Sequence, residues 1–182
     1  MKLIHLSDLH LGKRLNEFSM LEDQEFILKK IVNIINNEKP ENVIITDDIY
    51  DKSVPSTKAI TLFDDFLVRL SARNLKVFVI SGNHDSPERM SFANRLINQS
   101  GVFISPVYDG KISPTTLTDE YGTLDVFMLP FIKPANVKRF YPDEVINGYT
   151  DAVKVAVQNM AIDPENRNFL ITHQFVTGAA RC

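Results

Sequence analysis

Residues 76–85 read KVFVISGNHD and join a continuous apolar run to a cluster of polar side chains. A run without polar alternation is typical of a strand that is buried on both faces of a parallel sheet. Gly82 permits a backbone turn that other residues resist, directly before an amide, an imidazole and a carboxylate. Because ligands bind at the carboxyl ends of strands in open α/β sheets, we expect Asn83, His84 and Asp85 to belong to a functional site.

Polar residues follow three other expected strands in the same way. In chain order they are Asp8 and His10 after residues 2–6, Asp47 and Asp48 after residues 42–46, and His173 after residues 168–172. Four polar clusters at the carboxyl ends of strands should converge on one place. Asp, Asn and His provide oxygen and nitrogen ligands without thiolate, a set that suits manganese, iron, zinc or magnesium.

The segments between these strands have the apolar spacing of amphipathic helices, which predicts an α/β fold. The expected helices cover residues 20–37, 57–73, 87–98 and 142–160. Further strands are expected over residues 102–104, 111–117 and 125–129. Because no helix separates these three strands, we predict that they form a second, more antiparallel sheet.

The composition is that of an ordinary globular protein, with 182 residues of which 44% are hydrophobic and 24% charged. The length favours one domain over residues 1–182 with no second domain, and no apolar run approaches the roughly 20 residues of a membrane span. The single cysteine, Cys182, excludes an internal disulfide framework and favours a cytoplasmic location. The formal charge of −3 excludes a chain that holds nucleic acid by bulk charge alone, although a metal ion can supply local positive charge.

The residue types and their spacing favour metal-dependent phosphodiester chemistry. Residues i and i+2 of an extended segment point to the same side, so Asp8 and His10 can reach one ion. Asp48 has two carboxylate oxygens and can bridge two ions, which would activate a water and stabilise a phosphodiester under attack. His84 could donate a proton to the leaving oxygen or bind phosphate. Each motif alone has a structural explanation, and His5 in mid-strand is interpreted as structural; the three histidines that follow expected strands favour the metal site together.

The longer motifs resemble the calcineurin-like metallophosphoesterase superfamily and, within it, the SbcD-type DNA repair nuclease subunits. The segments that carry the resemblance are residues 1–12 (MKLIHLSDLHLG), 48–51 (DIYD), 53–55 (SVP), 81–86 (SGNHDS) and 171–175 (ITHQF). The resemblance implies a sandwich of two sheets flanked by helices, with metal ions at the sheet ends. It also implies that residues 1–182 are the N-terminal part of a nuclease domain that is incomplete at its C-terminal end.

The resemblance assigns roles to individual residues of the predicted site. It implies two divalent ions, most simply manganese, with Asp8, His10 and Asp48 at the first and Asp48, Asn83 and His173 at the second. His84 would be the catalytic histidine that contacts the scissile phosphate. Asp85 would be a neighbouring catalytic carboxylate that orients it.

The resemblance also implies a biological role. Proteins of this type are manganese-dependent exonucleases and endonucleases that cut DNA ends and hairpins in DNA repair, recombination and replication. They act as homodimers with an ATPase of the SbcC type. Two alternatives stay open, namely a phosphodiesterase that acts on small substrates and a catalytically inactive scaffold of the same fold.

The sequence departs from the family pattern in two ways. The family has glycine before the bridging aspartate, where this chain has Asp47, whose carboxylate could raise metal affinity, crowd the site or point away. The family also continues past His173 to a Gly-His-x-His motif, which gives each ion a further histidine, whereas this sequence ends at Cys182. We therefore expect the isolated chain to bind metal more weakly and to have little or no nuclease activity.

Overall fold

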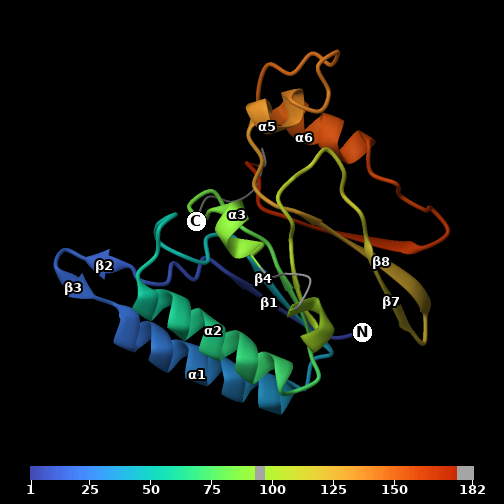
Figure 1. Ribbon diagram of the computed structural model, residues 1–182. Coiled ribbons are helices and arrows are strands. Elements are labelled where there is room, and N and C mark those ends of the chain that lie inside the picture. The colour runs from blue at the N-terminus through green and yellow to red at the C-terminus, as the bar shows by residue number, and fades with distance from the viewer. Residues whose placement is uncertain (93–96, 176–182) are drawn as a thin grey trace. The chain divides into compact units, whose positions relative to one another are not determined.

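The computed structural model describes residues 1–92 and 97–175 (Figure 1). Contacts between its residues divide the chain into two compact units, Met1–Val107 and Tyr108–Cys182. Each unit is described by itself, and the expectation of a single domain over residues 1–182 stays a prediction.

The first unit is built on a four-stranded parallel sheet. In spatial order the strands are β1 (Leu3–Ser7), β4 (Asn42–Thr46), β5 (Lys76–Val79) and β6 (Val102–Ile104). The helices α1 (Leu21–Glu38) and α2 (Thr57–Ser71) connect successive neighbours. Spatial order follows chain order, and crossovers between parallel strands are right-handed, so both helices lie on the same face of the sheet (Figure 1).

The core of the first unit lies between this face and the two helices. On the helix side of β4, Val43 and Ile45 are completely buried and pack in one cluster with Leu28 of α1 and Phe66 of α2. All five residues of β4 are buried, as its continuous apolar pattern predicts. The helix α2 begins after Ser56, whose hydroxyl oxygen accepts a hydrogen bond from the backbone N–H of Ala59.

Two expectations for the first unit were wrong in detail. Residues 102–104 pair in parallel with β5 and belong to the first sheet, not to the second. The connection that follows β5 exceeds the dozen residues that a parallel crossover needs, which allows this pairing. The helix expected over residues 87–98 is described as α3 (Pro87–Met90), and the short helix η1 (Asn98–Ser100) follows residues 93–96, which lie outside the described residues. A hairpin of β2 (Arg14–Leu15) and β3 (Phe18–Ser19) was not predicted.

The second unit contains a three-stranded mixed sheet. Its strands are β7 (Thr115–Asp119), β8 (Gly122–Leu129) and β9 (Arg167–Thr172), in that spatial order. β7 and β8 are antiparallel, whereas β8 and β9 are parallel and are connected through α5 (Pro134–Lys138) and α6 (Tyr149–Gln158). The helix expected over residues 142–160 begins later, because Gly148 has an extended backbone.

A parallel sheet, a further mixed sheet and flanking helices confirm the predicted α/β fold class. Within residues 1–92 and 97–175, none of the helices is both long and apolar enough to cross a membrane.

Candidate metal centre

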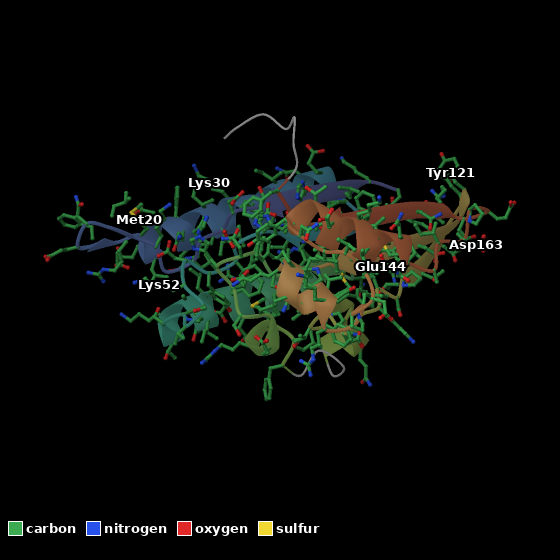
Figure 2. The ribbon with its side chains drawn as sticks, turned by 90° about the horizontal axis from the view of Figure 1, so that it is seen from above. Met20, Lys30, Lys52, Tyr121, Glu144 and Asp163 are labelled. Carbon is green, nitrogen blue, oxygen red and sulfur yellow. The ribbon has the colours of Figure 1, made fainter. Side chains whose placement is uncertain are left out.

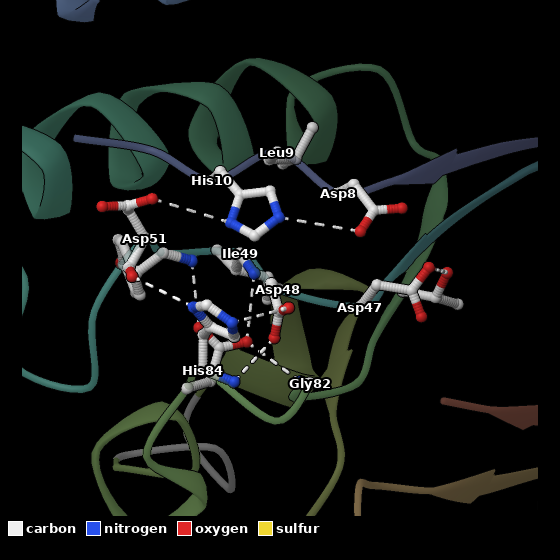
Figure 3. Close-up of polar contacts among 12 residues, drawn as sticks. Asp8, Leu9, His10, Asp47, Asp48, Ile49, Asp51, Gly82 and His84 are labelled. Carbon is white, nitrogen blue, oxygen red and sulfur yellow. Dashed lines mark hydrogen bonds and ion pairs between the residues drawn. The ribbon is translucent and has the colours of Figure 1, made fainter. Parts of the chain in front are cut away.

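Three of the four predicted polar clusters meet at one edge of the first sheet. They follow β1, β4 and β5, which are direct neighbours and run parallel (Figure 3). Ligand atoms of His10, Asp48 and His84 all lie within 4.8 Å of one another. The fourth cluster residue, His173, follows β9 in the second unit, where its ring centroid lies 5.9 Å from that of Phe131.

Backbone hydrogen bonds join the loop after β1 to the loop after β4. The N–H of His10 donates to the carbonyl of Asp48 at 2.9 Å, and the N–H of Leu11 donates to the carbonyl of Ile49 at 2.8 Å. The N–H of Asp51 donates back to the carbonyl of Leu11 at 3.2 Å. This ladder continues the pairing of the two strands beyond their ends, and it places His10 beside Asp48.

Asp8 and His10 come together on a backbone that differs from the expected one. Their φ angles are +53° and +42°, in the left-handed region, so the extended geometry that we expected for this pair was wrong. The reason is that β1 ends at Ser7, one residue before the pair begins. Asp8 Oδ1 nevertheless lies 3.7 Å from His10 Nε2. The side chain of Asp8 is exposed, and its role as a ligand stays a prediction.

The carboxylate of Asp85 joins the loop after β4 to the loop after β5. Its Oδ2 accepts hydrogen bonds from the N–H groups of Ile49 and Gly82 at 3.0 Å, and its Oδ1 accepts one from Tyr50 at 2.9 Å. Asp85 is only 7% exposed, and burial raises the pKa of its carboxyl above the ordinary value, against the lowering effect of the three N–H donors. Asp85 thus fixes the backbone of both loops, while its predicted catalytic role stays a prediction.

Gly82 allows the loop after β5 to approach the loop after β4 closely. A Cβ atom at this position would collide with Asp48 Oδ1 and would lie only 2.6 Å from the backbone nitrogen of Asp48. The N–H of His84 donates to the same Asp48 Oδ1 at 2.7 Å. Asp48 is buried, so its carboxylate is held in place by the neighbouring loop.

A backbone carbonyl fixes the protonation of one ring nitrogen of His84. His84 Nδ1 lies 3.2 Å from the carbonyl oxygen of Asp51. Since a carbonyl can only accept, Nδ1 carries a proton, and Nε2 of the neutral ring has the free lone pair. Nε2 lies 3.9 Å from Asp48 Oδ2, and the side chain of His84 is 47% exposed. The ring therefore presents Nε2 toward the centre on its solvent-accessible side.

Asp51 contacts both histidines of the cluster. Its Oδ1 lies 3.9 Å from His10 Nδ1, on the side of the ring opposite Asp8 (Figure 3). The buried Nδ1 of His10 has no hydrogen-bond partner among the described residues. A buried imidazole nitrogen without such a partner, close to carboxylates, fits a ligand position for a divalent cation. The sequence interpretation gave Asp51 no role, although its place three residues after Asp48 was a usable signal.

Asp47 points away from the cluster, which decides among the alternatives left open for it (Figure 3). Its Oδ2 accepts a hydrogen bond from the Thr46 hydroxyl at 3.2 Å, and that hydroxyl oxygen lies 2.7 Å from His5 Nε2. The φ angle of Asp47 is +72°, a conformation that glycine adopts more easily. Asn83 is exposed in the loop after β5, and its role as an amide ligand stays a prediction.

The sequence is similar to known phosphoesterases over almost its whole length. Residues 1–179 match the calcineurin-like phosphoesterase family. The chain is 32% identical over 184 residues to the SbcD component of the nuclease SbcCD from Staphylococcus saprophyticus, covering 100% of this chain and 48% of that protein. It is 32% identical over 181 residues to the SbcD component of the same nuclease from Staphylococcus epidermidis, covering 98% and 47%. The chain thus spans about half the length of these curated relatives.

The left-handed backbone at position 47 gives a stability prediction. We expect Asp47→Gly to be more stable than Asp47→Ala by about 1 kcal/mol, because only the alanine variant keeps a Cβ atom at a φ of +72°. The alanine variant is the matched control for loss of the carboxylate. Urea unfolding in the presence of a chelator measures the difference. A glycine variant that is no more stable than the alanine variant would contradict the backbone assignment.

The raised pKa of Asp85 gives a pH prediction. We expect Asp85→Asn to lower the free energy of unfolding by about 1–3 kcal/mol, because an amide N–H would face a backbone donor. The contribution of a carboxyl whose folded pKa is raised is present below its ordinary pKa of 3.8 and is lost as pH rises through the folded value.

The advantage of the unchanged chain over Asp85→Asn should therefore shrink as pH rises through that window. Urea unfolding at a series of pH values, with a chelator present, measures it. Asp143→Asn, at an exposed position, should show no such trend. An advantage that grows with pH would contradict the prediction.

The contacts of Asp51 predict a role in metal affinity. Asp51→Ala should weaken manganese binding about 10- to 100-fold, because His10 loses the carboxylate that faces its Nδ1. The backbone carbonyl that holds His84 is retained, so nitrogen NMR should still show the proton on His84 Nδ1. Titration calorimetry measures the affinity, with the exposed Asp65→Ala as control. Unchanged affinity in Asp51→Ala would argue against this role.

Proposed function

Because the chain belongs to the calcineurin-like phosphoesterase family, we propose that it is a manganese-dependent nuclease that hydrolyses phosphodiester bonds of DNA. The observation that carries the proposal is the convergence of His10, Asp48 and His84 at the ends of three adjacent strands. The curated relatives are named as part of the nuclease SbcCD, which supports DNA as the substrate and ends or hairpins as its form.

The donor set fits a divalent cation of the manganese type. Imidazole nitrogens and carboxylate oxygens are ligands that manganese accepts, and the buried Nδ1 of His10, which lacks a hydrogen bond among the described residues, is suited to such a contact. We propose that Asp8, His10 and Asp48 hold a first ion. Asn83 and His173 are proposed as ligands of a second ion, shared through Asp48, on the family resemblance alone. Bound ions would supply an activated water and offset the charge of the phosphate.

His84 is the residue that we propose to contact the scissile phosphate. Its Nδ1–H donates to the carbonyl of Asp51, which fixes the ring, and its side chain is half exposed. A ring that is also protonated at Nε2 can donate to the leaving oxygen while it keeps the bond to Asp51. Asp85 holds the loop that carries His84, so it acts on the reaction through position.

We also propose the partners and setting of the full-length protein. The relatives are named as one component of SbcCD, which supports an ATPase partner of the SbcC type and a role in DNA repair, recombination and replication in the cytoplasm. A homodimer is proposed as well. A groove of about 280 Å³, lined by residues of α2 and α3 and by the 80% exposed Phe92, is an apolar surface on which a second copy could pack.

Manganese-dependent cleavage of a labelled DNA hairpin tests the proposed activity. The chain should cleave the hairpin with manganese but not with a chelator, and Asp48→Asn should abolish cleavage and weaken manganese binding at least tenfold, because Asp48 contributes a ligand atom to the cluster. Asp65→Asn, an exposed carboxylate changed in the same way, is the matched control.

Two further results bear on the proposal. Turnover should be well below that of the Staphylococcus epidermidis relative assayed beside it, and equal turnover would contradict the expected impairment of this chain. Cleavage that Asp48→Asn leaves intact, or no cleavage although manganese is bound, would contradict the proposed nuclease.

A further inference from the structure

Three aromatic rings gather at the carboxyl ends of β8 and β9 in the second unit. Phe131 follows β8, Phe175 follows β9, and Tyr149 is the first residue of α6. The ring centroids of Phe131 and Phe175 are 5.7 Å apart, and those of Tyr149 and Phe175 are 5.2 Å apart, both edge to face. The His173 ring lies 5.9 Å from Phe131. We call Phe131, Tyr149 and Phe175 the aromatic platform.

The aromatic platform is not part of the hydrophobic core. Phe175 is 69% exposed and Tyr149 is 39% exposed, whereas Ile132, next to Phe131 in the chain, is 1% exposed and belongs to the core. Large apolar rings that stay in contact with water lose the benefit of burial. A cluster of such rings marks a binding surface more often than a structural one.

The charges beside the aromatic platform favour a nucleic acid strand as its occupant. From Phe131 to Tyr141 the chain carries Lys133, Lys138 and Arg139, all exposed, and no acidic residue. Proteins that bind single strands combine cations along the backbone with aromatic rings that stack on the bases. An apolar peptide would satisfy the rings but not the cations.

We propose that the aromatic platform stacks against a base of an unpaired DNA strand and so holds that strand beside His173. This inference rests on the proposed nuclease function and specifies how it binds its substrate. Stacking uses the face that every base has, so the contact should be independent of sequence. It should also favour ends and loops, where bases are unpaired.

Binding of a labelled oligothymidylate to the chain, measured by fluorescence anisotropy with a chelator present to prevent cleavage, tests the inference. Phe175→Ala should weaken the affinity about tenfold, since a base loses its stacking partner, and Phe175→Trp should restore it. Tyr121→Ala is the matched control, because Tyr121 is a 69% exposed ring in the turn before β8, at the opposite end of that strand (Figure 2).

An oligonucleotide of equal length with abasic sites separates stacking from charge. The unchanged chain should bind it about tenfold more weakly than oligothymidylate, and Phe175→Ala should bind both equally. Circular dichroism confirms that each variant is folded. Equal affinity of the unchanged chain for both ligands, no binding of oligothymidylate, or no effect of Phe175→Ala would overturn the inference.

The outcome is distinguishable from failure of the nuclease proposal. If only the aromatic platform is wrongly assigned, cleavage still depends on Asp48 while Phe175→Ala binds like the unchanged chain. If only the nuclease is wrongly assigned, the oligonucleotide still binds through Phe175, but no cleavage depends on Asp48.

Discussion

The buried carboxylate of Asp85 accepts three backbone hydrogen bonds, and the geometry of the candidate metal centre depends on them. Two of the donors, Ile49 and Tyr50, belong to the loop after β4, and the third, Gly82, belongs to the loop after β5. A buried N–H without an acceptor costs free energy, so the two loops stay together only while this carboxylate is present. The bond from the His84 N–H to Asp48 then fixes the side chain that the cluster shares.

This arrangement separates a rigid part of the centre from an accessible part. Asp48 is buried and held from a neighbouring loop, and the backbone ladder places His10 beside it. His84 is half exposed, with its inner nitrogen bonded to the carbonyl of Asp51 and its outer nitrogen near Asp48. Ligands that are positioned before the ion arrives bind it at lower cost, while an open histidine can reach a substrate.

Sequence patterns predicted the parts of this structure that follow from hydrophobic burial. The continuous apolar runs of β4 and β5 indicated strands within a parallel sheet, and neighbouring strands necessarily bring their following loops to one edge. The pattern could not give the left-handed backbone of Asp8 and His10, because aspartate and histidine carry no glycine-like signal for it. It also missed Asp51, whose role depends on the carbonyl group and on distances in space. The position of β6 depends on strand pairing between distant residues, which local spacing does not encode.

The central claim is that His10, Asp48 and His84 surround a cation, and anomalous diffraction from a crystal grown with manganese tests it most directly. A peak recorded at the manganese absorption edge should lie within bonding distance of Asp48 and His10, beside the Nε2 atom of His84. A peak that lies elsewhere, or the absence of any peak at these side chains, would contradict the account.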